Sequence, residues 1–341
     1  MKAVRIHQHG SKDVLQIDDL AIPKISKSQC LVNVKAAALN HLDIWVRKGF
    51  PGIPLPLIMG SDGAGIIVEI GDEVENFSIG DRVLVQPLTY CDKCKWCNRN
   101  MENYCDNWGI LGENQNGLQC EYIAIDTKYL RKIPEKMTFE QSAAFPLVAE
   151  TTYTMLVDRA NIQNSETVFI WGASSGVGSM AIQIAKAYNC KVITTVGDSQ
   201  NKNFAEQLGA DFVLNYKTIN ISKAINDITN SNGVDVVVEH VGAETWKTSM
   251  RILGKGGRVV TCGATTGSGV RFDLRHLFYK QQSILGSTMG NAQSLDKALD
   301  LFKKGKIKPV VDKQLNMSEI QAAHEYLENG HQIGKIIINI E

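Results

Sequence analysis

The chain has 341 residues, of which 44% are hydrophobic, enough for the cores of two domains. Its 36 basic and 36 acidic side chains cancel, so its charge does not indicate a nucleic-acid partner or an anionic membrane surface. The N-terminal residues lack the apolar core of a signal peptide, and no apolar run is long enough to span a bilayer. We therefore expect a soluble, cytoplasmic protein.

Residues 1 to about 135 are expected to form a β-rich region with short strands and many turns. Examples of the predicted strands are Lys2–Ile6, Gln29–Ala38, Gly65–Ile70, Arg82–Gln86 and Glu121–Ile125. Two stretches of this region carry chemistry: one runs from Asn40 to Asp62, and the other from Cys91 to Cys105.

From about Thr138 the pattern changes to alternating helices and strands. A mostly helical segment is expected over 139–156, with an interruption at Pro146. The predicted strands are Val168–Trp171, Lys191–Val196, Phe212–Asn215, Val234–Glu239, Gly257–Cys262 and Ser283–Ser287. Apolar strands separated by helices predict a parallel sheet covered on both faces, in the doubly wound α/β nucleotide fold. The tail is expected to form two helices, 294–304 and 318–328, and a strand over 335–340 that returns to the first domain.

A glycine-rich turn lies between the first of these strands and the helix that follows it. The stretch TVFIWGASSGVGSMAIQIAKAYNCK, from Thr167 to Lys191, combines an apolar strand, a loop with little side-chain bulk and apolar residues at helical spacing. Such a turn lets backbone N–H groups approach a pyrophosphate at a helix N-terminus. The alternative is a purely structural strand-to-helix turn. The expected coenzyme contacts here are Gly172, Ser174, Ser175, Gly176, Val177 and Gly178.

The end of the second parallel strand bears on the choice of coenzyme. NAD sites usually place an acidic residue there, but this chain has Val196 and Gly197 at the position. Ser199 and Lys202 follow and suit a 2′-phosphate, which favours NADPH over NADH, although Asp198 argues for NADH. Contacts with the nicotinamide are expected after the fifth and sixth strands, from Gly263, Ala264, Thr265, Ser287 and Thr288.

Four cysteines have the spacing of metal ligands. Cys91, Cys94 and Cys97 form CxxCxxC, and Cys105 follows after seven intervening residues. Four thiolates complete a tetrahedral zinc shell and leave no open position, so the spacing predicts one structural zinc ion. An iron–sulfur cluster is the alternative.

Together these features resemble the medium-chain dehydrogenase/reductase superfamily, over essentially the whole chain. The resemblance implies a β-rich GroES-like catalytic domain over 1–137 and 289–341, with the zinc lobe at 91–105. It also implies a Rossmann domain over 138–288 and a homodimer or homotetramer, paired through the sheet edge at Ser283–Ser287. The substrate is then a small molecule, with no nucleic acid or membrane involved.

The zinc alcohol dehydrogenases of this superfamily hold a second, catalytic zinc, and the resemblance breaks at its ligands. Asn40 stands at the position of the first Cys, and Gly60-Ser61-Asp62 replaces the GHE motif. No Cys or His occurs near 147–150, where the third ligand is expected. A substitute site built from His41, Asp43, Asp62 and Glu150 would lack a recognisable ligand spacing.

Other segments are similar to the branch without catalytic zinc, which includes quinone oxidoreductases and enoyl reductases. These are ALNHLDIWVRKG and GASSGVG, and three more, GSDGAGIIVEIG, NWGILGE and PLVAETTYTML, resemble reductases of unsaturated acyl-CoA thioesters. This resemblance implies an NADPH-dependent reductase of an activated double bond, such as that of acryloyl-CoA. A rebuilt zinc alcohol dehydrogenase, a quinone oxidoreductase and a nucleotide-binding protein without catalysis remain as alternatives.

The reductase interpretation assigns a role to Asn40, whose amide would donate a hydrogen bond to the substrate carbonyl. A turn residue that bonds its own backbone is the alternative for this position. His41 is either a proton source or a loop residue. Some enoyl reductases carry a Tyr after the residue matching Gly49, where this chain has Phe50 and Pro51.

Overall fold

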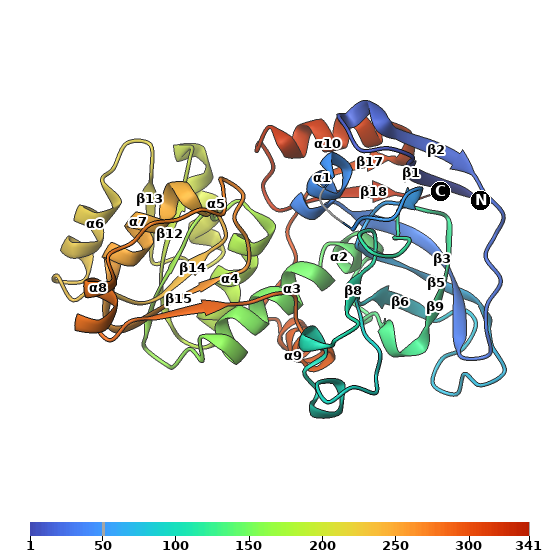
Figure 1. The fold of residues 1–341 in the computed structure, drawn as a ribbon, viewed down its shortest axis with the longest axis horizontal. Helices are drawn as coiled ribbons and strands as arrows, with labels where there is room; N and C mark the ends of the chain where they lie inside the picture. The colour runs from blue at the N-terminus through green and yellow to red at the C-terminus, as the bar shows by residue number, and fades with distance from the viewer. Residues whose placement is uncertain (50–51, 341) are drawn as a thin grey trace. The chain divides into compact units, whose positions relative to one another are not determined.

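The computed structural model describes residues 1–49 and 52–340, so the positions of Phe50 and Pro51 lie outside the described residues. The chain divides into two compact units (Figure 1). The β-rich unit comprises Met1–Val148, Asn291–Leu295 and Pro309–Glu341, and the parallel-sheet unit comprises Ala149–Gly290 and Asp296–Lys308. Among the described residues, no helix has the length and apolar character needed to cross a membrane.

The β-rich unit is built on a seven-stranded sheet in the order β10-β6-β5-β3-β18-β17, with β9 paired to β3. A three-stranded sheet, β2-β1-β4, and the pair β7-β8 complete it. The strands are β1 (Lys2–Ile6), β2 (Leu15–Asp19), β3 (Gln29–Ala38), β4 (Leu57–Ile58), β5 (Asp62–Ile70), β6 (Arg82–Val85), β7 (Leu88–Thr89), β8 (Gly109–Ile110), β9 (Tyr122–Asp126), β10 (Leu130–Lys132), β17 (Val311–Asn316) and β18 (Lys335–Asn339). The β-rich unit also contains the helices α1 (His41–Lys48), α2 (Phe139–Ala143) and α10 (Ile320–Glu328). The division between the two units falls within α3 (Pro146–Tyr153) and again within α9 (Ala292–Lys303).

The C-terminal strand β18 lies inside the large sheet, antiparallel to β3 and parallel to β17. The predicted return of the tail to the first domain is therefore confirmed. Three successive isoleucines of β18, at positions 336–338, are almost fully buried in the core of this unit. Since successive side chains of a strand point to opposite faces, their burial shows that both faces of β18 are covered.

The parallel-sheet unit holds six parallel strands in the order β13-β12-β11-β14-β15-β16. The strands are β11 (Thr167–Ile170), β12 (Lys191–Val196), β13 (Phe212–Asn215), β14 (Val234–Glu239), β15 (Leu253–Thr261) and β16 (Ser283–Gly286). The connecting helices are α4 (Gly176–Ala187), α5 (Lys202–Gln207), α6 (Ile221–Ile228), α7 (Ala243–Ile252) and α8 (Leu274–Tyr279). This order is that of the doubly wound dinucleotide fold, whose direction reverses between β11 and β14. The predicted fold class is confirmed.

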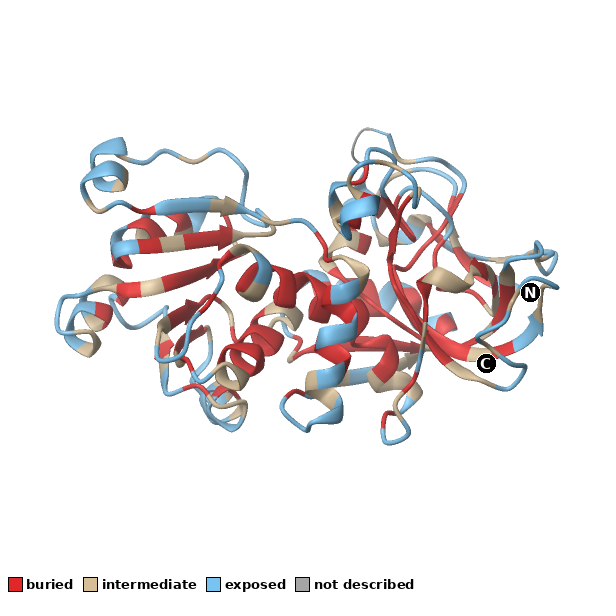
Figure 2. Cartoon of the chain, turned by 90° about the horizontal axis from the view of Figure 1, so that it is seen from below, coloured by how far each residue is buried: buried red, intermediate tan, exposed pale blue. Residues whose placement is uncertain are grey.

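Buried residues follow the strands of both units, whereas outer helix faces and loops are exposed (Figure 2). The predicted helix over 139–156, with its interruption at Pro146, forms α2 and α3, and Pro146 is the first residue of α3. The structure departs from the predicted elements in other places. A π-helical turn follows α3 at Thr154–Arg159, and the strands β2, β4, β7, β8 and β10 were not named from the sequence. Strand β15 begins at Leu253, before its glycines, and β17 was not predicted because its residues are mostly polar.

Candidate functional site

The glycine turn lies at the carboxyl end of β11. Gly172 has a φ of +64°, which glycine adopts without strain. The hydroxyl of Ser175 donates to Gly172 O at 2.9 Å and accepts from the N–H of Gly178 at 2.8 Å, so it caps α4. A Cβ added at Gly178 would lie 2.0 Å from Gly172 O, so only glycine lets the helix start so close to the strand. These contacts start the helix directly after the strand, as in the turns of doubly wound folds that bind a pyrophosphate.

The turn after β14 is held by a buried carboxylate. Glu239 accepts hydrogen bonds from the backbone N–H groups of Val241 and Gly242 and from the hydroxyls of Thr245 and Ser249. His240 follows it and lies within 2.9 Å of the carbonyl oxygen of Trp171, measured from Nε2. Burial lowers the pKa of His240, which favours a neutral imidazole at this edge.

The predicted nicotinamide contacts come to the same edge of the sheet. Gly263, Ala264 and Thr265 follow β15, while Ser287 and Thr288 follow β16. The backbone N–H of Ser287 donates to Thr261 O at 2.9 Å, which continues the pairing of the two strands. The parallel sheet therefore gathers the sequence-predicted residues after β11, β15 and β16 at its carboxyl edge, where doubly wound folds bind ligands.

A pocket of about 600 Å³ opens at this edge. Its lining residues are Trp171, Gly172, Thr195, Tyr216, Ile219, Asn220, Ile221, Ser222, Val241, Glu244, Thr245, Thr248, Arg251 and Thr266. Ser199 and Lys202 are not among them. The hydroxyl of Ser199 accepts from Asn215 at 3.2 Å, and Lys202 pairs with Glu206 at 3.7 Å. Arg251 is the cation that lines this pocket.

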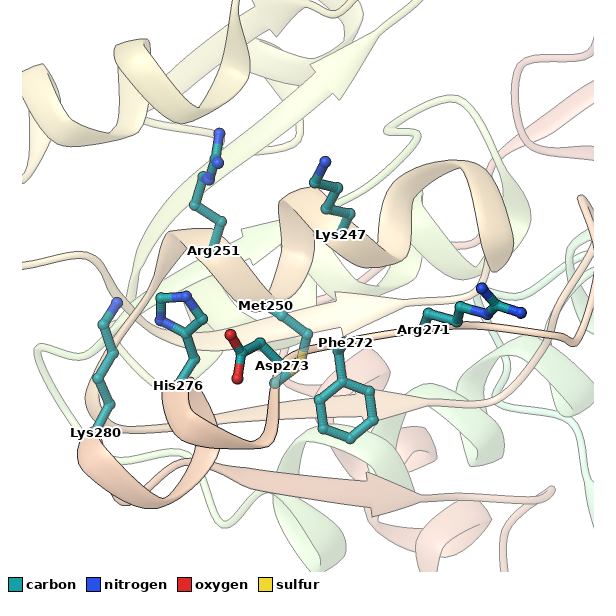
Figure 3. A pocket seen from close by; sticks show the side chains of 8 residues that line it. All are labelled: Lys247, Met250, Arg251, Arg271, Phe272, Asp273, His276 and Lys280. Carbon is teal, nitrogen blue, oxygen red and sulfur yellow. The ribbon is translucent and has the colours of Figure 1, made fainter.

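A second pocket of about 600 Å³ shares Arg251 and lies between α7 and the segment around α8 (Figure 3). Its lining residues are Lys247, Met250, Arg251, Arg271, Phe272, Asp273, His276 and Lys280. The Asp273 carboxylate already pairs with Arg275 at 2.6 Å, and this contact lowers its pKa to about 2. The basic side chains therefore dominate the charge of this pocket.

The four cysteines form one cluster whose sulfur atoms all lie within 4.8 Å of one another. The backbone N–H groups of Cys91 and Asn107 each donate to Sγ of Cys105 at 3.3 Å. Backbone hydrogen bonds, the largest from Cys97, lower the pKa of Cys94 to about 6, whereas burial raises that of Cys97 to about 12. Four convergent thiol groups with N–H···S support fit a tetrahedral zinc ion, which would hold all four as thiolates.

Asn40 lies directly before α1, with only 7% of its surface exposed. Its amide nitrogen donates to Oδ2 of Asp62 at 2.9 Å, and its amide oxygen accepts from the ammonium group of Lys335. The same ammonium donates to Oδ2 of Asp62 at 3.0 Å, which closes a ring of three hydrogen bonds. The other oxygen of Asp62 accepts from the backbone N–H of Leu147 at 2.9 Å.

Two further predicted residues begin α1 beside this ring. His41 is half-buried at the first helical position. Asp43 is fully buried and accepts from the backbone N–H of Asn40 at 2.7 Å. Burial raises the pKa of Asp43 to about 7. Among residues 1–49 and 52–340, the four cysteines are the one group of potential metal ligands whose atoms converge.

Comparison with known proteins accounts for both units. The alcohol dehydrogenase GroES-like domain matches residues 26–135, and the zinc-binding dehydrogenase domain matches residues 176–304. An NAD-dependent alcohol dehydrogenase of Sulfolobus acidocaldarius is 35% identical, with 100% of both chains covered. The chain belongs to the medium-chain dehydrogenase/reductase superfamily.

Other members of this superfamily are similar over the same length. An acryloyl-coenzyme A reductase of Metallosphaera sedula is 29% identical, with 99% of each chain covered. A crystal structure of an NAD-dependent alcohol dehydrogenase has a TM-score of 0.97 and 37% identity, with 100% of both chains covered. The chain is thus an oxidoreductase of the superfamily that uses a nicotinamide coenzyme, and its cysteine cluster supports a structural zinc.

Four residues near the candidate sites were not identified from the sequence: Lys335, His240, Tyr216 and Arg251. Lys335 begins an apolar strand, and a single charge before a buried run was the available signal. Tyr216 approaches Gly197 so closely that an added Cβ there would lie 2.6 Å from its hydroxyl oxygen. His240 and Arg251 left no motif, because the fold alone brings His240 to the carbonyl oxygen of Trp171 and Arg251 to the carboxyl-edge pocket.

Proposed function

We propose that this protein is an NADPH-dependent reductase of an activated carbon–carbon double bond, such as that of an enoyl-CoA like acryloyl-CoA, and that it works without a catalytic zinc. The observation that carries the proposal is the ring of Asn40, Asp62 and Lys335. Two of its members stand at positions where zinc alcohol dehydrogenases are expected to hold metal ligands. The buried ammonium group of Lys335 takes the place of a metal cation there. Unlike zinc, an ammonium group cannot polarise an alcohol as a Lewis acid.

The glycine turn and the carboxyl edge of the parallel sheet would hold the coenzyme, and the chemistry it would supply is a hydride for the β-carbon of the substrate. The electron pair of the double bond then moves toward the carbonyl oxygen, which gains negative charge. Asn40 would donate its second amide N–H to that oxygen. The α-carbon then takes a proton from water or from a side chain such as His41, which completes the saturated product.

The alternative is an alcohol dehydrogenase, and the names of the Sulfolobus relative and of the 37% identical structure favour it. Such an enzyme would need a source of alkoxide stabilisation other than the four-cysteine zinc, whose ligand shell is already complete. The proposed reductase needs only hydrogen-bond donors. The two functions therefore differ in their need for a second metal ion.

A substrate panel with metal analysis separates the two. We expect NADPH oxidation with acryloyl-CoA, crotonyl-CoA or simple enones, one zinc per chain, and the same rate after EDTA removes loosely bound metal. Asn40→Ala should lower kcat about a hundredfold, the usual effect of losing one oxyanion donor. Coenzyme reduction by alcohols that depends on a second metal ion, with no activity on enones or enoyl-CoA, would refute the proposal.

We also propose a homodimer, or a tetramer of such dimers, formed through the edge strand β16. This strand ends the parallel sheet, and Ile284 on it is 37% exposed. The nearby helix α8 exposes Leu274, Phe278 and Tyr279 by 63% or more. An apolar sheet edge of this kind favours pairing with a second copy. Sedimentation of a monomer at micromolar concentration would contradict this assembly.

A further inference from the structure

Two buried charged side chains hold the side-chain amide of Asn40, one at its oxygen and one at its nitrogen. Lys335, which touches its oxygen, is only 4% exposed, and Asp62, which touches its nitrogen, is fully buried. All three residues belong to the β-rich unit, so the ring does not depend on how the two units are placed. Asn40 and Lys335 nevertheless lie 295 residues apart in the chain.

The chemistry of the two neighbours fixes the orientation of the amide. An ammonium group can only donate hydrogen bonds, and an ionised carboxylate can only accept them. The amide oxygen must therefore face Lys335, and the amide nitrogen must face Asp62. The flipped amide would place two donors together and two acceptors together, both buried, which is costly on either side.

We propose that Lys335 is the positioning residue for Asn40: its buried ammonium locks the amide so that the second N–H of the nitrogen is presented to the substrate carbonyl. This inference rests on the proposed function, because it takes Asn40 as the donor to that oxygen. Without the ammonium, the amide could rotate and offer its oxygen to a developing negative charge. Lys335 thus acts through Asn40, without itself touching the substrate.

The charges around the ring support this assignment. Lys335 balances Asp62 directly, with Nζ and Oδ2 3.0 Å apart, so the pair is neutral without a metal ion. Asp43 also faces the site, and burial favours its protonated form. The main-chain N–H of Asn40 is bonded to Asp43, so both the backbone and the side chain of Asn40 are held. An incoming divalent cation would have to displace the ammonium.

A double-mutant cycle tests whether Lys335 acts through Asn40. Lys335→Met should lower kcat at least tenfold, and Asn40→Ala about a hundredfold, the magnitude typical of a lost oxyanion donor. The double variant should be no slower than Asn40→Ala within about twofold, because the amide that Lys335 orients is already absent. Multiplying effects in the double variant would overturn the proposal.

Two further variants keep the test decisive. If Lys335→Met does not fold because Asp62 is left unpaired, the cycle is run in the Asp62→Asn/Lys335→Met background, which removes both charges. There, Asn40→Ala should lower kcat by no more than about tenfold, the remainder of the hundredfold effect, and a full hundredfold loss would show that Asn40 is positioned without Lys335. Lys132→Met is the matched control, because this lysine pairs with Asp81 at 2.8 Å with over half of its side chain exposed, and it should leave kcat unchanged.

The cycle is measured with whichever substrate of the panel is turned over. A substrate without an activated carbon–carbon double bond would contradict the proposed function and still leave the coupling between Lys335 and Asn40 readable. Conversely, enoyl-CoA reduction with independent effects of the two substitutions would retain the function and refute the role of Lys335. Zinc content and coenzyme affinity of each variant should stay at the wild-type values, since neither residue belongs to the cysteine cluster or to the glycine turn.

Discussion

Gly178→Ala is expected to disrupt the coenzyme turn from inside the protein. The added Cβ would lie 2.0 Å from the carbonyl oxygen of Gly172 and 2.9 Å from Oγ of Ser175. Ordinary contacts of a Cβ begin at 3.4 Å, so the loop and the start of α4 must separate. Because the closest atom belongs to the backbone, no side-chain rotation relieves the contact, and a shift of roughly 1 Å is required in a packed region.

The expected loss in the free energy of unfolding is about 1–3 kcal/mol, the usual result of overpacking a core position. Coenzyme binding should weaken more. Moving the helix start withdraws backbone N–H groups from the pyrophosphate, and one lost bond to a charged group is worth about 1.5–3 kcal/mol. The dissociation constant for NADPH should therefore rise tenfold or more. Urea denaturation and coenzyme titration by tryptophan fluorescence measure the two quantities.

Gly269→Ala is the matched control, since an added Cβ there meets nothing within 4 Å. It makes the same chemical change in the same unit and should alter neither quantity. If Gly178→Ala bound NADPH with wild-type affinity, the close approach of strand and helix would not be what shapes the pyrophosphate site.

Three further predictions concern the zinc lobe, the coenzyme and pH. Cys97→Ser should lower stability more than turnover per folded molecule, and equal stability with abolished turnover would contradict a structural zinc. NADPH should exceed NADH in kcat/KM, and Lys202→Ala should erode that preference; a variant that keeps it would indicate another cation, such as Arg251. Burial raises the pKa of Asp43 from 3.8 to about 7. The contribution of protonated Asp43 to the free energy of unfolding is therefore complete below pH 3.8 and lost as the pH rises through 7. Asp43→Asn should thus become more stable relative to wild type between about pH 4 and pH 8 in denaturant titrations, and a constant difference would refute this.

The fold and the metal lobe could be predicted from the sequence because their signals are local. The cysteine spacing and the turn at Gly172–Gly178 each lie within one short stretch, and alternating strands and helices define the parallel sheet. Strand β17 escaped prediction because a polar sequence is ordered there only by its pairing with β18. The start of β15 at Leu253 was hidden by three glycines before position 258.

The candidate catalytic site was only partly predictable, for the same reason. Asn40 was identified through resemblance, but its partner Lys335 stands alone at the start of an apolar strand. Contacts between residues so far apart in the chain leave no spacing to read. At the coenzyme site, Lys202 was identified from its position after β12. Its ion pair with Glu206 could not be predicted in the same way, because that pair depends on the helix α5 that forms there.

The position of β18 inside the large sheet has a consequence for folding during synthesis on the ribosome. Strand β3 is synthesised early, yet its neighbour in the sheet emerges only after the whole parallel-sheet unit has been made. Because domains fold as units during synthesis, the parallel-sheet unit can complete its folding first, while the large sheet of the β-rich unit still lacks β18. During that interval the carboxylate of Asp62 has no ammonium partner. When β18 pairs with β3, Lys335 reaches Asp62, so the missing strand and the compensating charge are supplied together. Mutations near the C-terminus should therefore impair the maturation of the N-terminal half of the chain.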